Sequence, residues 1–230
     1  MMCMSLQATY KIDRAEVLRY LGYSGQELDE LLSERIERAM ERCEQVSNPG
    51  FTYRIFPVDA SAGSIRLEGT TLVLEGADAF EHLRGARECA VMAATAGLAN
   101  ERELRQLSQL GGLDGMLFDA ASSAYAEVVA DACNAAIVAQ ARSRGLYAKW
   151  RFSPGYGDFP LDIQADIVRV LAADRKIGVT TTDSSMLVPT KSVTAFVGLF
   201  DSPQDDGHSC ERCSFSPYCE LKRKGSPCYR

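Results

Sequence analysis

The chain has 230 residues, of which 46% are hydrophobic and 24% are charged, a composition typical of a globular protein with its own core. Its formal net charge is −6, and no run of residues reaches the apolar length that a transmembrane helix requires. These values argue against a nucleic-acid-binding protein, which usually carries a basic surface, and against a membrane protein.

The first fifty residues are predicted to be helical. Asp13 is a candidate N-cap for a short helix that ends at Gly22. Ser24 followed by Glu27 matches a capping box, and apolar residues keep a helical period through the segment that follows. The Asn-Pro-Gly turn at 48–50 is expected to end this second helix.

Short strands and helices alternate through the rest of the body. The expected elements are strands at 51–58, 64–67 and 71–74, a helix at 77–84, a buried strand at 89–94, helices at 100–110, 114–144 and 162–174, and strands at 177–182 and 192–200. Gly69 suits a hairpin between the second and third strands. The helix at 114–144 is unusually long and rich in Ala and Ser, so we expect a break in it or a buried path along its centre.

Hairpins together with alternating helices favour an α+β fold, with a mixed or antiparallel twisted sheet and flanking helices. The polar, turn-forming residues after the last strand predict a linker. We therefore expect one domain over residues 1–200, with 1–50 as its helical N-terminal part, a linker at 201–209 and a cysteine-rich tail at 210–230.

The most informative segment is the loop at 151–160, Arg-Phe-Ser-Pro-Gly-Tyr-Gly-Asp-Phe-Pro. Its prolines restrict the backbone while its glycines permit conformations that other residues avoid, which predicts an ordered loop with accessible backbone groups. The guanidinium of Arg151 is suited to bidentate binding of a carboxylate. The alternative is a surface turn whose arginine pairs with a nearby acidic residue. The residues alone do not choose between these interpretations.

The order of motifs from Arg151 onward resembles the activation domain of cobalamin-dependent methionine synthase. That family has an Arg-x-x-Pro-Gly-Tyr loop, a helix, a Gly-containing strand, a Met-x-Pro stretch and a Ser-Val strand. Here the same order is given by Arg-Phe-Ser-Pro-Gly-Tyr at 151–156, Lys-Ile-Gly-Val at 176–179 and Met-Leu-Val-Pro-Thr-Lys-Ser-Val at 186–193. The segment 12–23 also resembles short, stand-alone relatives of that domain, so the resemblance extends over much of the chain.

The resemblance implies that the loop binds S-adenosylmethionine (AdoMet). Arg151 would hold the methionine carboxylate, the backbone at Ser153, Pro154 and Gly155 would face the adenosine, and Tyr156 would lie near the transferable methyl group. Glu127 on the long preceding helix is the best match for the family's acidic ligand, with Asp131 one turn later. An acidic residue suits a ligand that carries an ammonium and a sulfonium, although a solvated helix face is the alternative for Glu127.

The eight cysteines form two groups. Cys3, Cys43, Cys89 and Cys133 are isolated, and an isolated cysteine is usually a small buried hydrophobic residue. The other four lie within the last 21 residues, as Cys210, Cys213, Cys219 and Cys228. The N-terminus has neither the basic start nor the apolar run of a signal peptide, so a cytoplasmic location is expected and a metal site is favoured over structural disulfides.

Two cysteines separated by two residues can place both thiolates on one metal, and two further cysteines complete a tetrahedral set. Both an iron–sulfur cluster and zinc fit this spacing, and free thiols remain an alternative. Fused methionine synthases lack such cysteines, so the tail departs from the family.

By this resemblance the chain is expected to support reductive reactivation of methionine synthase, as a component of a methyltransferase. It has no segment that resembles a cobalamin-binding motif, so the cobalamin must be carried by a partner protein, with an electron donor such as flavodoxin or ferredoxin. One alternative is an activator of another corrinoid methyltransferase that uses the tail as an electron relay. Another is a non-catalytic module that binds a corrinoid protein. No nucleic-acid or membrane partner is expected.

Overall fold

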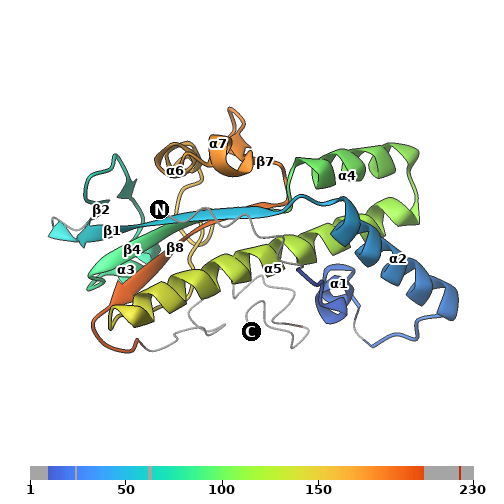
Figure 1. Cartoon of the computed structure of the whole chain (residues 1–230), viewed down its shortest axis with the longest axis horizontal. Helices are drawn as coiled ribbons and strands as arrows, with labels where there is room; N and C mark the ends of the chain where they lie inside the picture. The colour runs from blue at the N-terminus through green and yellow to red at the C-terminus, as the bar shows by residue number, and fades with distance from the viewer. Residues whose placement is uncertain (1–9, 24, 62–63, 205–222, 224–230) are drawn as a thin grey trace.

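A computed structural model describes residues 10–23, 25–61, 64–204 and 223 (Figure 1). The helices are α1 (Arg14–Tyr20), α2 (Glu30–Val46), α3 (Ala77–Leu83), α4 (Leu98–Leu110), α5 (Leu113–Ser143), α6 (Gln164–Leu171) and α7 (Ala173–Ile177). The strands are β1 (Gly50–Asp59), β2 (Ile65–Leu67), β3 (Val73–Leu74), β4 (Glu88–Thr95), β5 (Tyr147–Ala148), β6 (Thr180–Thr181), β7 (Leu187–Val188) and β8 (Ser192–Phe200). The α+β class predicted from the sequence is confirmed.

A six-stranded sheet in the order β3-β2-β1-β4-β8-β5 forms the centre of the domain. All its paired strands are antiparallel, and β4 pairs along its whole length with β1 on one side and β8 on the other. The predicted hairpin at Gly69 joins β2 to β3. A separate pair of strands is formed by β6 and β7. Figure 1 shows α5 running along one face of the sheet, with α6 and α7 over the other.

Each face of the sheet has its own core, because successive residues of a strand point to opposite sides. Met92 of β4 packs in the core beneath α5. Its neighbour Val91 packs in the core that includes residues of α3 and α6. The chain between α5 and α6 must therefore pass from one face of the sheet to the other at the β5 edge, and the Arg151 loop (residues 151–160) lies in this passage.

Helix α5 is continuous over 31 residues, so the break that the sequence suggested is wrong and the buried central path is confirmed. Its small side chains explain why no break is needed. Ala121, Ala124 and Ala130 are almost completely buried, and their size allows the helix to lie close to the sheet and to α2 along its length.

The second helix begins later than the sequence predicted. Asp29 is its N-cap, with a side-chain oxygen that accepts a hydrogen bond from the Leu32 amide at 2.6 Å. The capping-box prediction at Ser24 and Glu27 is therefore wrong, because the helix begins after Asp29, whose side chain caps it at the Leu32 amide. Residue 24 itself lies outside the described residues.

The predicted helix at 162–174 is divided in two. Ala172 has a left-handed backbone, with φ of 52°, which ends α6 and starts α7 in a new direction. Since α7 continues to Ile177, the strand predicted at 177–182 is reduced to β6. The structure also adds β5 and β7, which are too short to leave a pattern in the sequence.

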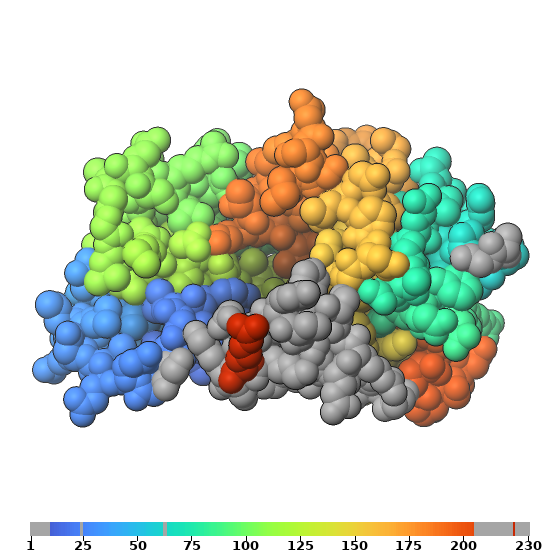
Figure 2. Space-filling model, turned by 180° about the vertical axis from the view of Figure 1, so that it is seen from behind, coloured from blue at the N-terminus to red at the C-terminus, as the bar shows by residue number. Residues whose placement is uncertain are grey.

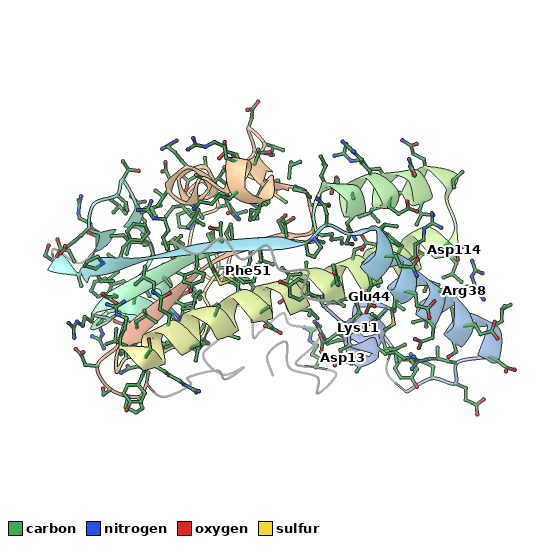
Figure 3. The ribbon with its side chains drawn as sticks, viewed as in Figure 1. Lys11, Asp13, Arg38, Glu44, Phe51 and Asp114 are labelled. Atoms are coloured by element: carbon green, nitrogen blue, oxygen red, sulfur yellow. The ribbon has the colours of Figure 1, made fainter. Side chains whose placement is uncertain are left out.

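The segment before α1 is fixed to α2. Lys11 Nζ lies 2.6 Å from Glu44 Oε2, and the Ile12 amide donates to Glu44 Oε1 at 2.9 Å. Figure 3 shows the Lys11 and Glu44 side chains together beside α1 and α2. Asp13 caps α1 as predicted, by accepting from the Ala15 amide. These contacts fix the start of α1 to α2, and α1 also packs on α5.

Cys43, Cys89 and Cys133 are buried and free, as predicted. Burial is the main cause of the raised pKa of all three thiols, which for Cys133 reaches about 12. Cys3 and the four tail cysteines lie outside the described residues, as does most of the predicted linker, so the metal site stays a prediction. Among the helices of the described residues, none is long and apolar enough to cross a membrane.

Candidate functional site

Arg151 is presented at the edge of the sheet, in an extended segment that continues β5. The next residue, Phe152, exchanges two backbone hydrogen bonds with Phe196 of β8, each 2.9 Å long. Phe152 points into the core shared with α3 and α6. Because neighbouring residues of an extended chain point in opposite directions, Arg151 is directed toward α5.

The guanidinium of Arg151 lies between two carboxylates of α5. Its Nη2 donates to Glu127 Oε2 at 2.6 Å, and its Nη1 donates to Asp131 Oδ1. The exposed fractions of the side chains are 24% for Arg151, 38% for Glu127 and 69% for Asp131. Burial lowers the pKa of Arg151, but the two carboxylates outweigh this effect, so the pKa lies above its ordinary value and the charge is kept.

This charge arrangement is complementary to an α-amino acid. A guanidinium has more N–H donors than the two that Glu127 and Asp131 engage, so Arg151 retains donors for a ligand carboxylate. The two carboxylates accept from an ammonium group and attract other positive charge nearby. With two acids and one base, the cluster carries a net negative charge, which favours a ligand with more positive than negative groups.

The rest of the Arg151 loop forms a compact turn. The Gly155 amide donates to the Phe159 carbonyl at 2.8 Å, and the Tyr156 amide donates to the Ser153 carbonyl at 3.3 Å. Pro154 is buried, whereas Gly155 and Tyr156 are exposed, with 58% of Tyr156 accessible. The Gly155 amide is therefore used within the loop, while the Tyr156 side chain is exposed at its surface.

Helix α1 brings a residue to this region that the sequence did not single out. Tyr20 is 40% exposed, and its ring lies under the Arg19 guanidinium, with 4.5 Å from Cζ to the ring centroid. Burial and the negative charge of Glu127 raise the pKa of the Tyr20 phenol. Tyr20 is therefore within electrostatic reach of Glu127, and α1, which carries Tyr20, packs on α5. No motif signalled this, because the proximity depends on how α1 packs on α5.

A second loop approaches α5 on the turns that precede Glu127. In the Pro189 loop (residues 189–192), Lys191 Nζ lies 2.8 Å from Asp119 Oδ1 and donates to Ser123 Oγ at 2.8 Å. Ser123 and Glu127 are one helical turn apart, so they are neighbours on the helix surface. The two loops thus bring Lys191 and Arg151 to successive turns of α5.

The Pro189 loop is also held by a buried acid of α4. Glu101 Oε2 accepts from the Thr190 amide at 2.8 Å and from the Thr190 hydroxyl at 2.7 Å, while Oε1 accepts from Arg105. The Glu101 side chain is 5% exposed. Burial raises the pKa of Glu101, but the hydrogen bonds from Thr190 and the charge of Arg105 outweigh it, so the pKa is below its ordinary value.

The surface between these loops is hollowed. Figure 2 shows the hollow bordered by the gold segment that follows α5, the orange segment that precedes β8, and the yellow-green α5 below. Two other cavities, of about 370 and 470 Å³, are lined by residues of α6, α7 and β6 and by residues around Gly76, respectively. Neither of these two cavities is lined by Arg151, Glu127 or Asp131.

No protein-family model matches the chain, and no curated protein matches it by sequence. Among solved structures, it is similar to a crystal structure of the MetH reactivation domain bound to AdoHcy, with a TM-score of 0.65 and 15% sequence identity. The match covers 95% of this chain and 82% of that chain. At this identity the likeness establishes the fold, an antiparallel sheet with flanking helices, over nearly the whole length.

Proposed function

We propose that the chain binds AdoMet in the hollow beside α5. The observation that carries the proposal is the Arg151 cluster, in which one guanidinium lies between two carboxylates. In this proposal Arg151 binds the methionine carboxylate, while Glu127 accepts from the ammonium group and Asp131 contributes negative charge. The carboxylates also offset the positive sulfonium, so the cluster complements all three charges of the ligand.

The loop residues that follow Arg151 complete the proposed site. The backbone of Ser153, Pro154 and Gly155 faces the adenosine, and the exposed ring of Tyr156 lies near the methyl group. The likeness in fold to a reactivation domain that was crystallised with AdoHcy supports this assignment, since the match covers 95% of this chain.

We further propose that the bound AdoMet serves the reductive reactivation of cobalamin-dependent methionine synthase. The methyl group passes from the sulfonium sulfur to the cobalt of reduced cobalamin on a partner protein, and the sulfur keeps the bonding electron pair, which leaves AdoHcy. The one-electron reduction that precedes this step is supplied by a donor such as flavodoxin or ferredoxin. The chain's own contribution is binding and orientation, so no acid–base group is needed at the methyl carbon.

Two measurements test the proposal. Calorimetric titration of the full chain with AdoHcy is expected to give saturable binding with one site per chain. Methyl transfer is then followed by the absorbance of methylcobalamin when AdoMet, a chemical reductant and a cobalamin-loaded methionine synthase are mixed with the chain. Absence of AdoHcy binding contradicts the whole proposal. Binding without methyl transfer contradicts the catalytic part and favours a non-catalytic module that recognises a corrinoid protein.

We also propose that Cys210, Cys213, Cys219 and Cys228 bind one metal centre, either an iron–sulfur cluster or zinc. Four thiols with this spacing are the donor set that both centres use. Anaerobic purification followed by iron, sulfide and zinc analysis decides between them. Serine at positions 210 and 213 is expected to abolish bound metal and leave AdoHcy affinity unchanged. Full-length protein without any metal under these conditions contradicts the proposal.

A further inference from the structure

Helix α3 lacks an N-cap of its own, because the residue at that position is Gly76, which has no side chain. Asp158 of the Arg151 loop takes this role from 81 residues away, with Oδ2 accepting from the Ala77 amide at 2.6 Å. Its Oδ1 accepts from the Asp78 amide at 3.0 Å. These hydrogen bonds to the helix lower the pKa of Asp158. The first turn of α3 is therefore completed by the same loop that carries Arg151 and Tyr156.

The contact is reciprocal and requires glycine on both sides. Asp78 Oδ2 accepts from the Asp158 amide at 3.4 Å, so each segment caps the other. A Cβ on Gly76 would lie 2.7 Å from Asp158 Oδ1, and a Cβ on Gly157 would lie 1.9 Å from Asp78 Oδ2. Both glycines also have positive φ, 103° and 57°. The two segments thus approach more closely than side chains at these positions would allow.

The other end of α3 contacts the residues on either side of Arg151. His82 is 4% exposed and lies 4.3 Å from Trp150 and 5.0 Å from Phe152 between ring centroids. Its Nε2 is 2.9 Å from the Trp150 carbonyl. Since a carbonyl oxygen only accepts, Nε2 carries the proton and donates. One short helix is therefore bonded to the chain just before Arg151 and again just after Tyr156.

We propose that α3 is a positioning element for the ligand loop, and that Asp158 and His82 are the residues through which it acts. The inference rests on the proposed function, in that the loop is taken to bind AdoMet. Neither residue touches Arg151 or its carboxylates in the described hydrogen bonds, yet both fix the backbone that sets the direction of Arg151 and Tyr156. Because the two contacts link the loop to α3, a ligand that orders the loop also stabilises α3.

AdoHcy is the probe, and its affinity for the full chain is measured by calorimetry. Asp158→Ala is expected to weaken binding about five- to tenfold, as for loss of a helix cap. Asp158→Asn keeps one acceptor oxygen and is expected to restore most of the affinity. His82→Phe keeps the ring packing but removes the donor to Trp150, with a loss of about threefold expected. The matched control is Glu81→Ala, an exposed residue of α3 whose ion pair is to Arg84 within the helix.

Amide hydrogen exchange gives a readout that is independent of affinity. In the wild type, saturating AdoHcy is expected to slow exchange in α3 as well as in the loop. Asp158→Ala is expected to speed exchange at Gly155 and Phe159, not only at Ala77 and Asp78. Circular dichroism identifies any variant that fails to fold, in which case His82→Phe and Asp158→Asn decide the question.

The outcomes separate the two proposals. Failure of the wild type to bind AdoHcy overturns the proposed function, and the loop exchange of Asp158→Ala then decides the positioning role alone. If AdoHcy binds but Asp158→Ala and His82→Phe keep wild-type affinity, α3 does not position the ligand loop, even if thermal stability falls. Unchanged exchange at Gly155 and Phe159 in Asp158→Ala overturns the positioning role in either case.

Discussion

Each of the two loops that meet α5 is held in part by carboxylates, and these carboxylates differ in exposure. The Pro189 loop is attached through Glu101, which is 5% exposed and bonds to both the amide and the hydroxyl of Thr190. The Arg151 loop is attached to α5 through Glu127 and Asp131, which are 38% and 69% exposed. Because Glu101 is shielded from water, water does not compete for its hydrogen bonds with Thr190. Water can compete for the more exposed ion pairs of Arg151.

Because these carboxylates differ in exposure, we expect the Pro189 loop and the Arg151 loop to have different roles. A buried carboxylate that satisfies two donors stabilises one conformation strongly, because its loss leaves polar groups unpaired. Exposed ion pairs contribute little to stability and are easily rearranged. In the proposed site, the Arg151 cluster can therefore rearrange around a charged ligand at small cost to the fold, while the Pro189 loop stays fixed beside it. Each prediction below tests this division.

The largest expected effect is on ligand binding. Arg151→Ala should weaken AdoHcy binding by about 1.5–3 kcal/mol, since it removes a hydrogen bond to a charged group. The free energy of unfolding should change by less than about 1 kcal/mol, because the ion pairs are partly exposed. Calorimetric titration and urea denaturation measure the two quantities. Arg169→Ala is the control, because Arg169 pairs with Asp166 within α6 and lines a different cavity. Unchanged affinity in Arg151→Ala would remove this residue from the site.

The second effect is on stability. Glu101→Ala should lower the free energy of unfolding by about 2 kcal/mol, because the Thr190 donors lose a charged, buried acceptor. AdoHcy affinity should fall much less than in Arg151→Ala. Urea denaturation of Glu101→Ala and of Glu34→Ala, whose partner Arg38 is also exposed, makes the comparison. A loss in Glu101→Ala no larger than in Glu34→Ala would mean that the two loops are held alike.

A smaller effect should distinguish the two carboxylates of the Arg151 cluster. Glu127→Gln should weaken AdoHcy binding by about 1 kcal/mol and Asp131→Asn by about 0.5 kcal/mol, since the more exposed charge is better screened. Titrations at low and high salt should bring the two variants closer together as salt rises. Asp131→Asn with the larger loss would assign the ligand ammonium to Asp131 instead.

The smallest effect is a pH dependence of the Pro189 loop. The pKa of Glu101 is lower in the folded chain than its ordinary value, so its ionised form stabilises the fold above that ordinary value. This stabilisation is lost as the pH falls through the lowered pKa. The difference in unfolding free energy between wild type and Glu101→Gln should therefore be greatest near neutral pH and shrink in the acid range. Denaturation series at several pH values measure it, and a pH-independent difference contradicts the assignment.

Local patterns in the sequence predicted much of the fold. Asp13 as the cap of α1, the hairpin at Gly69 and the strand at Ser192–Phe200 all depend on residues that are close together in the chain. The α+β class follows from the same local signals. The division at Ala172 was missed, because nothing in an apolar helical period marks a residue with a left-handed backbone.

Local sequence patterns predicted only part of the candidate site. A motif pointed to Arg151 and Tyr156, and the family resemblance pointed to Glu127, with Asp131 one helical turn later. The contacts that hold the loops join residues far apart, as in Glu101 with Thr190 and His82 with Trp150, which are separated by 89 and 68 positions. No periodic pattern of residues in the sequence predicts contacts between positions so far apart.

The sequence by itself determined most of the helices and long strands and where the informative loop lies, because these depend on propensity, capping and spacing over a few residues. Only the tertiary structure decided that Arg151 lies between two carboxylates, that α1 packs on α5 and that Asp158 caps α3. The physical reason is that the order of strands in the sheet and the packing of α1 and α5 bring these groups together, and long-range packing leaves no local signal in the chain.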